Sequence, residues 1–206
     1  MLKAEEQQLL KRYFPEAAVP MVGEMFIQRR FKLHFKRPRS SKLGDFRPPR
    51  TPNGICSITL NLDLNPYQML VTYIHEVAHY DVFQQFGLRQ VQPHGQEWQT
   101  SFATLLQSFL TEAVFPHDVL VALQKHLHHI KASSTTDLNL QRVLQQYDSK
   151  TDNTTTLETL PPGARFILKN GLTFQKGEKQ RTRYKCYCES NGRWYFVSAL
   201  AEVKRL

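Results

Sequence analysis

The chain has 206 residues, of which 41% are hydrophobic and 22% are charged, a composition typical of folded globular proteins and unlike that of disordered or collagen-like chains. Its longest unbroken apolar run, residues 119–123, is far shorter than the ~20 residues that a membrane-spanning helix needs. No apolar signal-peptide core follows Met1, and three cysteines are too few for a disulfide framework. We therefore expect a cytoplasmic protein without a membrane partner.

The net charge of +9 is concentrated at the two ends of the chain. Residues 1–50 carry 12 basic and 5 acidic side chains, residues 51–165 carry 6 and 10, and residues 166–206 carry 9 and 3. Basic segments favour an anionic partner, so DNA bound through the N-terminal and C-terminal segments is one expectation. A solvated basic surface without a specific partner is the alternative.

The part of the chain before residue 65 predicts short helices and strands. Helical spacing of apolar side chains indicates two helices, at residues 3–13 and 21–30. Alternation of apolar and polar side chains indicates two strands, at residues 31–36 and 55–62. A basic, proline-rich loop is expected between these strands.

The rest of the chain predicts helices followed by strands. A long helix is expected to begin after Asn65 and to end at Gly87. Further helices are expected at residues 96–110, 116–130 and 138–147, and short strands at residues 165–168, 172–175, 182–188 and 193–198. The predicted organisation is an α+β domain over residues 1–148, a polar linker over residues 149–160 and a small all-β module over residues 161–206.

The strongest functional signal is the sequence His75-Glu76-Val77-Ala78-His79 inside the long helix. Four residues of helix rotate by about 400° and advance by about 6 Å, so both imidazoles project from one face and reach one metal ion. Glu76 lies beside this pair, where it can accept a proton from a metal-activated water molecule. The pattern predicts one catalytic Zn²⁺ ion with His75 and His79 as ligands and Glu76 as general base.

A catalytic zinc site needs a third protein ligand. The spacing H-E-x-x-H-x-x-G-x-x-H is excluded because Val82 and Gln85 stand where it requires Gly and His. His94 and Glu97 are the nearby candidates, and we favour His94 because the loop after the long helix is long enough to return it to that helix. Glu97 would then orient a ligand histidine without binding the metal itself.

These residues and their order resemble the SprT-like zinc metalloprotease family, which includes the Spartan proteases. The similarity covers about residues 20–110 and rests on the motifs KLGDFR at 42–47, ITLN at 58–61, HEVAH at 75–79 and HGQEW at 94–98. It implies a minimal zincin-like metalloprotease domain in which the H-E-x-x-H helix packs beside a small sheet, with His94 as the third zinc ligand. In the better-known relatives it also implies cleavage of DNA-bound proteins.

The C-terminal part departs from the bacterial relatives, which often carry a zinc ribbon with four cysteine ligands. This chain has only Cys186 and Cys188 there, spaced C-x-C, so we expect a β module without a zinc ribbon.

Two other groups of residues each allow a functional and a structural interpretation. Tyr73 and Tyr80 are candidate donors to a developing oxyanion, although packing explains them more simply. A second cluster is interpreted as a solvated helix end and not as a second metal site; it comprises His126, His128 and His129 with Lys125 and Lys131.

The sequence therefore leads to two hypotheses. The first is a zinc-dependent metalloendopeptidase that uses Glu76 as general base, acts on protein substrates and has DNA-bound proteins as a candidate substrate class. The second is a basic nucleic-acid-binding protein whose metalloprotease-like zinc site is structural or inactive. An intact Glu76 favours the first, because a purely structural zinc site needs no general base.

Overall fold

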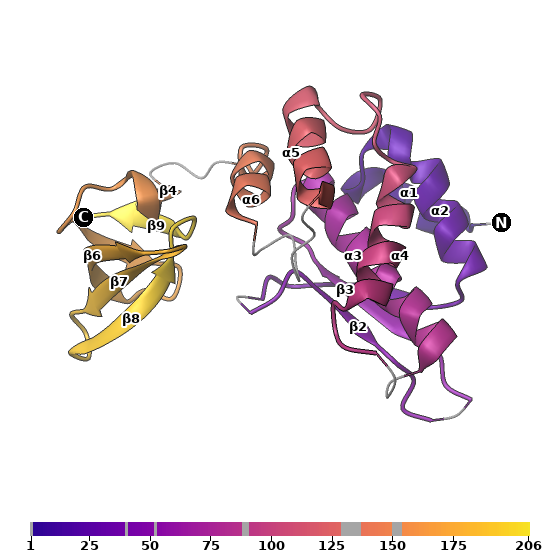
Figure 1. Ribbon diagram of the computed structural model, residues 1–206, viewed down its shortest axis with the longest axis horizontal. Helices are drawn as coiled ribbons and strands as arrows, with labels where there is room; N and C mark the ends of the chain where they lie inside the picture. The colour runs from indigo at the N-terminus through magenta and orange to yellow at the C-terminus, as the bar shows by residue number, and fades with distance from the viewer. Residues whose placement is uncertain (1, 40, 52, 88–90, 129–136, 150–153) are drawn as a thin grey trace. The chain divides into compact units, whose positions relative to one another are not determined.

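The computed structural model describes residues 2–39, 41–51, 53–87, 91–128, 137–149 and 154–206 (Figure 1). It divides into two compact units, Met1–Asp148 and Ser149–Leu206, each with its own hydrophobic core. Within the described residues, no helix has the length and apolar character required to cross a membrane.

The described part of the larger unit contains six α-helices. They are α1 (Ala4–Tyr13), α2 (Val19–Gln28), α3 (Pro66–Phe86), α4 (Gln96–Gln107), α5 (His117–His128) and α6 (Leu138–Gln145). The long helix α3 begins where the Asn65 side chain accepts hydrogen bonds from the backbone N–H groups of Tyr67 and Gln68. It ends at Gly87, whose φ of +70° lies in the left-handed region that glycine adopts readily.

A three-stranded sheet lies beside α3 in this unit. Its strands are β1 (Lys32–Lys36), β2 (Gly44–Arg47) and β3 (Ser57–Asn61), in the order β1-β3-β2. The central strand β3 runs parallel to β1 and antiparallel to β2, and it is nearly all buried. Helix α3 packs against β2, β3 and α4, so the HEVAH sequence lies between a sheet and a second helix (Figure 1).

Strand β2 corrects the prediction of a loop between the first two strands. Its four residues, Gly44 to Arg47, are too few and too polar to show an alternating pattern. The strand exists because its backbone pairs with β3, from Gly44 opposite Leu60 to Arg47 opposite Ser57. Tertiary pairing therefore created a strand where local sequence predicted none.

The smaller unit is a six-stranded antiparallel sheet. Its strands are β4 (Thr154–Thr156), β5 (Arg165–Leu168), β6 (Thr173–Gln180), β7 (Arg183–Cys188), β8 (Arg193–Ser198) and β9 (Glu202–Arg205), in the order β4-β9-β5-β6-β7-β8. Cys186 and Cys188 are free cysteines, and both are completely buried in its core beside Phe166 and Phe174. These two thiols serve as small apolar side chains of the core.

The prediction of a polar linker is wrong for residues 154–160. Threonines 154–156 form β4, which pairs with β9, and Leu157 and Leu160 are buried in the core of the smaller unit. Threonine suits a strand at the edge of a sheet, and the two leucines supply apolar contacts that the polar composition around them concealed. Residues 150–153 of the predicted linker lie outside the described part of the chain.

Candidate metal centre

Helix α3 presents His75 and His79 one turn apart on one face. Their Nε2 atoms lie 3.2 Å from each other. Glu76 follows His75 but points toward the sheet, and its side chain is buried. The helix therefore separates the two nitrogen donors from the carboxylate, as the motif predicts.

His94 reaches this face from the turn that precedes α4. The N–H of Gly95 donates to the carbonyl of Gln92, and Gln99 Nε2 donates to the carbonyl of His94, so the turn is held from both sides. His94 itself has a φ of +59°, in the left-handed region that few residues other than glycine occupy. Its Nε2 lies 3.0 Å from that of His79 and 3.2 Å from that of His75.

The three nitrogens fit one metal ion. Zinc–nitrogen bonds of 2.0–2.1 Å in tetrahedral geometry place ligand nitrogens about 3.3 Å apart, close to the separations of 3.0–3.2 Å seen here. Within the described ranges, His75, His79 and His94 form the one group of histidine, cysteine and acidic side chains close enough to hold an ion. Glu97, the alternative third ligand, is exposed and does not belong to this group.

The surroundings of the three imidazoles keep them in the neutral form that binds metals. Burial and the neighbouring histidines lower the pKa of His75 to about 2. Burial and His94 lower the pKa of His79 to about 4, and burial also lowers the pKa of His94. A metal ion that bound here at neutral pH would therefore displace few protons from these side chains.

Trp98 packs against all three histidines. Its ring centroid lies 4.6 Å from that of His75, 5.4 Å from that of His79 and 4.8 Å from that of His94. The indole N–H donates to the backbone carbonyl of His75 at 3.3 Å, and the side chain is 1% exposed. Trp98 thus restrains the three imidazole rings, a contact that the HGQEW motif alone does not predict.

Strand β2 encloses the Glu76 carboxylate. Burial raises the pKa of Glu76 to about 8, while a hydrogen bond from the backbone of Phe46 opposes this rise. A Cβ atom placed on Gly44 would lie 2.7 Å from Glu76 Oε1, so only glycine allows this approach. Gly44 and Phe46 both belong to the KLGDFR motif, but no local pattern in the sequence predicts that they contact Glu76.

The two tyrosines considered as oxyanion donors make contacts with other parts of the protein. Tyr73 is buried, and its hydroxyl donates to the carbonyl of Val22, whereas Tyr80 packs its ring against Phe31 and Phe46. Neither contact suggests a donor to a substrate oxyanion.

His126 corrects the prediction of a solvated helix end. Its side chain is buried and its Nδ1 lies 3.0 Å from Asp137 Oδ2, whereas His128 is exposed. His129 and Lys131 lie outside the described residues. The prediction of a solvated cluster is therefore wrong for His126.

Comparisons with known proteins place the chain in a family. No curated protein and no solved structure matches it. The model of the SprT-like family matches residues 10–119, which is more than half of the chain and includes His75, His79, His94 and the strand that encloses Glu76. The chain therefore belongs to the SprT-like family.

Proposed function

We propose that the protein is a zinc-dependent metalloendopeptidase with a zincin-like active site. The observation that carries this proposal is the convergence of three neutral imidazole nitrogens next to a buried carboxylate that is not one of the donors. Three protein ligands leave one tetrahedral position for water or substrate, which is the arrangement of catalytic zinc sites. A purely structural site would fill the fourth position and would not need Glu76.

In this proposal His75, His79 and His94 hold the ion. A zinc ion held by these three side chains would supply Lewis-acid chemistry, lowering the pKa of a bound water molecule toward about 7. The positive charge of that ion would favour the carboxylate form of Glu76 and so oppose the effect of burial. The carboxylate would accept the proton of the attacking water and return it to the departing amine. The backbone of Phe46 and the space beside Gly44 hold that carboxylate in place.

The test is Glu76→Gln, which preserves size and removes the base. We expect this variant to bind one zinc ion per chain and to lose cleavage of a basic DNA-binding protein, measured with and without single-stranded DNA. Glu112→Gln, which changes an exposed glutamate outside the site, is the matched control and should retain activity. Unchanged cleavage by Glu76→Gln would refute the mechanism.

DNA-bound proteins are the substrate class that we propose for this activity. The support is electrostatic: the first 50 residues, which include β2, carry 12 basic and 5 acidic side chains. A basic surface raises the local concentration of DNA and of proteins attached to it. Cleavage that increases when DNA is present, and loses that increase at high salt, is the expected result.

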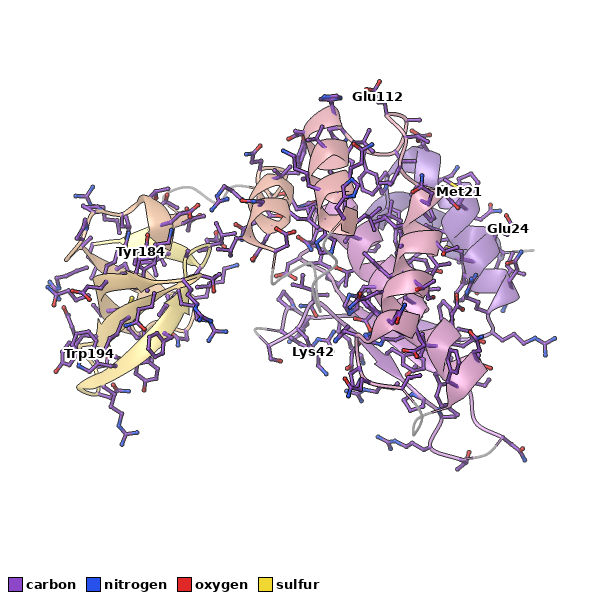
Figure 2. All side chains as sticks on the ribbon, viewed as in Figure 1. Met21, Glu24, Lys42, Glu112, Tyr184 and Trp194 are labelled. Carbon is purple, nitrogen blue, oxygen red and sulfur yellow. The ribbon has the colours of Figure 1, made fainter. Side chains whose placement is uncertain are left out.

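The second candidate function, nucleic-acid binding, is supported by exposed aromatic side chains on the sheet of the smaller unit. The register of β7 and β8 places Lys185, Tyr187, Trp194 and Phe196 on one face of the sheet. Trp194, which Figure 2 labels, is 57% exposed and Phe196 is 55% exposed. The Lys185 ammonium lies 4.9 Å from the Trp194 ring.

This face suits single-stranded nucleic acid. Exposed aromatic rings can stack with bases, and neighbouring cations can contact phosphates. No acidic residue occupies a position on this face of β7 or β8, where Arg183 and Lys185 provide positive charge.

A labelled oligonucleotide tests this second candidate by fluorescence anisotropy. Trp194→Ala and Lys185→Ala should each weaken binding about 5–50-fold, in line with ~1–3 kcal/mol per stacked base. Lys204→Ala, another exposed strand lysine of the same unit, is the control. Equal affinity in all variants would contradict the proposal, and binding without any proteolysis would favour the second candidate as the main function.

A further inference from the structure

His126 is a buried histidine with one satisfied nitrogen and one orphaned nitrogen. Its residue is 1% exposed, and its Nδ1 lies 3.0 Å from Asp137 Oδ2. Its Nε2 is buried and has no hydrogen-bond partner in the structure. A buried polar atom left without a partner costs about 1–3 kcal/mol, so this nitrogen calls for an explanation.

The Asp137 carboxylate determines the tautomer of His126. A carboxylate accepts hydrogen bonds, so the proton of the neutral ring resides on Nδ1 and donates to Oδ2. The Nε2 atom then carries a lone pair and can only accept. Asp137 is itself held in place, because its Oδ1 accepts the backbone N–H groups of Asn139 and Leu140 at the start of α6.

The metal ligand His75 has the complementary requirement. Its Nε2 faces the Nε2 atoms of His79 and His94, and a nitrogen that binds a metal must offer its lone pair. The proton of His75 therefore resides on Nδ1. No acceptor for this N–H lies within hydrogen-bonding distance among the described residues.

His75 and His126 belong to the same packed cluster. The ring of Phe102 packs edge-on against both, with centroid distances of 6.2 Å to His75 and 6.1 Å to His126. Both rings thus contact Phe102, and each carries a nitrogen without a hydrogen-bond partner among the described residues.

We propose that His126 and Asp137 position the metal ligand His75, with His126 Nε2 accepting the Nδ1–H of His75 through one bridging water molecule. Ligand histidines nearly always donate their second ring N–H to such a partner, which fixes the ring and raises its basicity. A single water molecule spans two groups that are too far apart to bond directly. His126 would be a positioning residue, because it does not touch substrate or metal.

This inference rests on the proposed metal site, and zinc affinity tests it independently of proteolysis. Competition with a chromophoric chelator should show zinc binding about 10–100-fold weaker in His126→Leu than in the wild type, the usual cost of losing such a partner. His128→Leu, an exposed histidine on the same helix, is the matched control and should bind zinc normally. An affinity of folded His126→Leu within twofold of the control would overturn the proposal.

A second variant, at Asp137, and a second measurement, of histidine tautomers, also test the proposed role of His126. Asp137→Asn keeps a side chain that can cap α6 but removes the charge behind His126, so a smaller loss of zinc affinity is expected. In the metal-free protein, ¹⁵N shifts should report the Nδ1–H tautomer for both His75 and His126, and His75 should become a mixture of tautomers in His126→Leu. If the wild type binds no zinc, the proposed function fails, and this tautomer measurement still decides the role of His126.

Discussion

Gly44 controls how closely the backbone of β2 approaches the carboxylate of Glu76. A Cβ atom there would lie 2.7 Å from Glu76 Oε1 and 2.8 Å from Thr72 Cγ2, so Gly44→Ala must displace one of these side chains. A misplacement of about 1 Å in a catalytic group can cost on the order of 100-fold in rate. We expect Gly44→Ala to lower kcat about 10–100-fold while one zinc ion per chain remains bound.

The control for this prediction is another Gly→Ala change, at Gly171. That glycine has a φ of +80°, and a Cβ atom added to it would meet no other heavy atom within 4 Å, so the change adds backbone strain far from Glu76 in the sequence. It should lower the thermal midpoint of the smaller unit and leave kcat unaltered. Equal kcat values for Gly44→Ala and the wild type would show that β2 does not position Glu76.

At the scale of elements, Asp137 joins the start of α6 to α5. Burial alone would raise the pKa of Asp137, but hydrogen bonds from His126 and from the backbone of Leu140 and Asn139 hold it below its usual value. A carboxyl group with a lowered pKa stabilises the fold at pH values above the pKa of the unfolded chain. That contribution is lost as the pH falls through the pKa of the folded protein.

Asp137→Asn isolates this charge because asparagine also caps helices well. We expect the variant to be less stable than the wild type by about 1 kcal/mol at pH 7, a modest value for a hydrogen bond to a partly exposed charge. The difference should begin to shrink below about pH 4, the pKa of an aspartate in the unfolded chain, and should continue to shrink as the pH falls through the lower pKa of folded Asp137. Urea unfolding at pH 7 and at pH 3 measures this difference in stability between Asp137→Asn and the wild type. A difference of equal size at both pH values would show that the charge of Asp137 does not stabilise the fold.

At the scale of the whole molecule, each unit contains one tryptophan. Trp98 lies against the three histidines of the larger unit and Trp194 lies on the smaller unit. Zinc at 100 times its Kd should stabilise the larger unit by about 2.7 kcal/mol. The unfolding transition that Trp98 reports should therefore rise in temperature with zinc and fall with a chelator, whereas the transition of the smaller unit stays constant.

A Trp194→Phe variant gives the Trp98 signal alone, and its difference from the wild type gives the smaller unit. Transitions that both shift with zinc would show that the two units unfold together. Zinc that moves neither transition would contradict the assignment of the three histidines as ligands.

The sequence predicts those parts of the site that lie close together along the chain. The spacing of His75, Glu76 and His79 specifies two donors on one helix face and a neighbouring carboxylate, because helix geometry is regular. His94 comes from a separate turn, so spacing alone left Glu97 open, and the reach of the loop and the family resemblance favoured His94. Contacts between distant segments, such as Gly44 with Glu76, have no local signature.

His126 shows how a local signal can be misread. It is flanked by lysine and further histidines, which indicates an exposed helix end. Yet Val119, Leu123 and His126 fall at helical spacing on the buried face of α5. That spacing is the sequence feature that indicates the burial of His126. Its partner Asp137 lies on another element, so the burial becomes understandable only in three dimensions.

The left-handed backbone of His94 determines which replacements give clean metal-free controls. Asparagine tolerates a φ near +59° better than most residues, so His94→Asn removes the imidazole and preserves the turn. A β-branched replacement such as valine would be strained there, and the chain would relax away from that conformation. Loss of zinc in His94→Val would therefore have two causes, the missing imidazole and the altered turn. Loss of zinc in His94→Asn would have one cause, the missing imidazole.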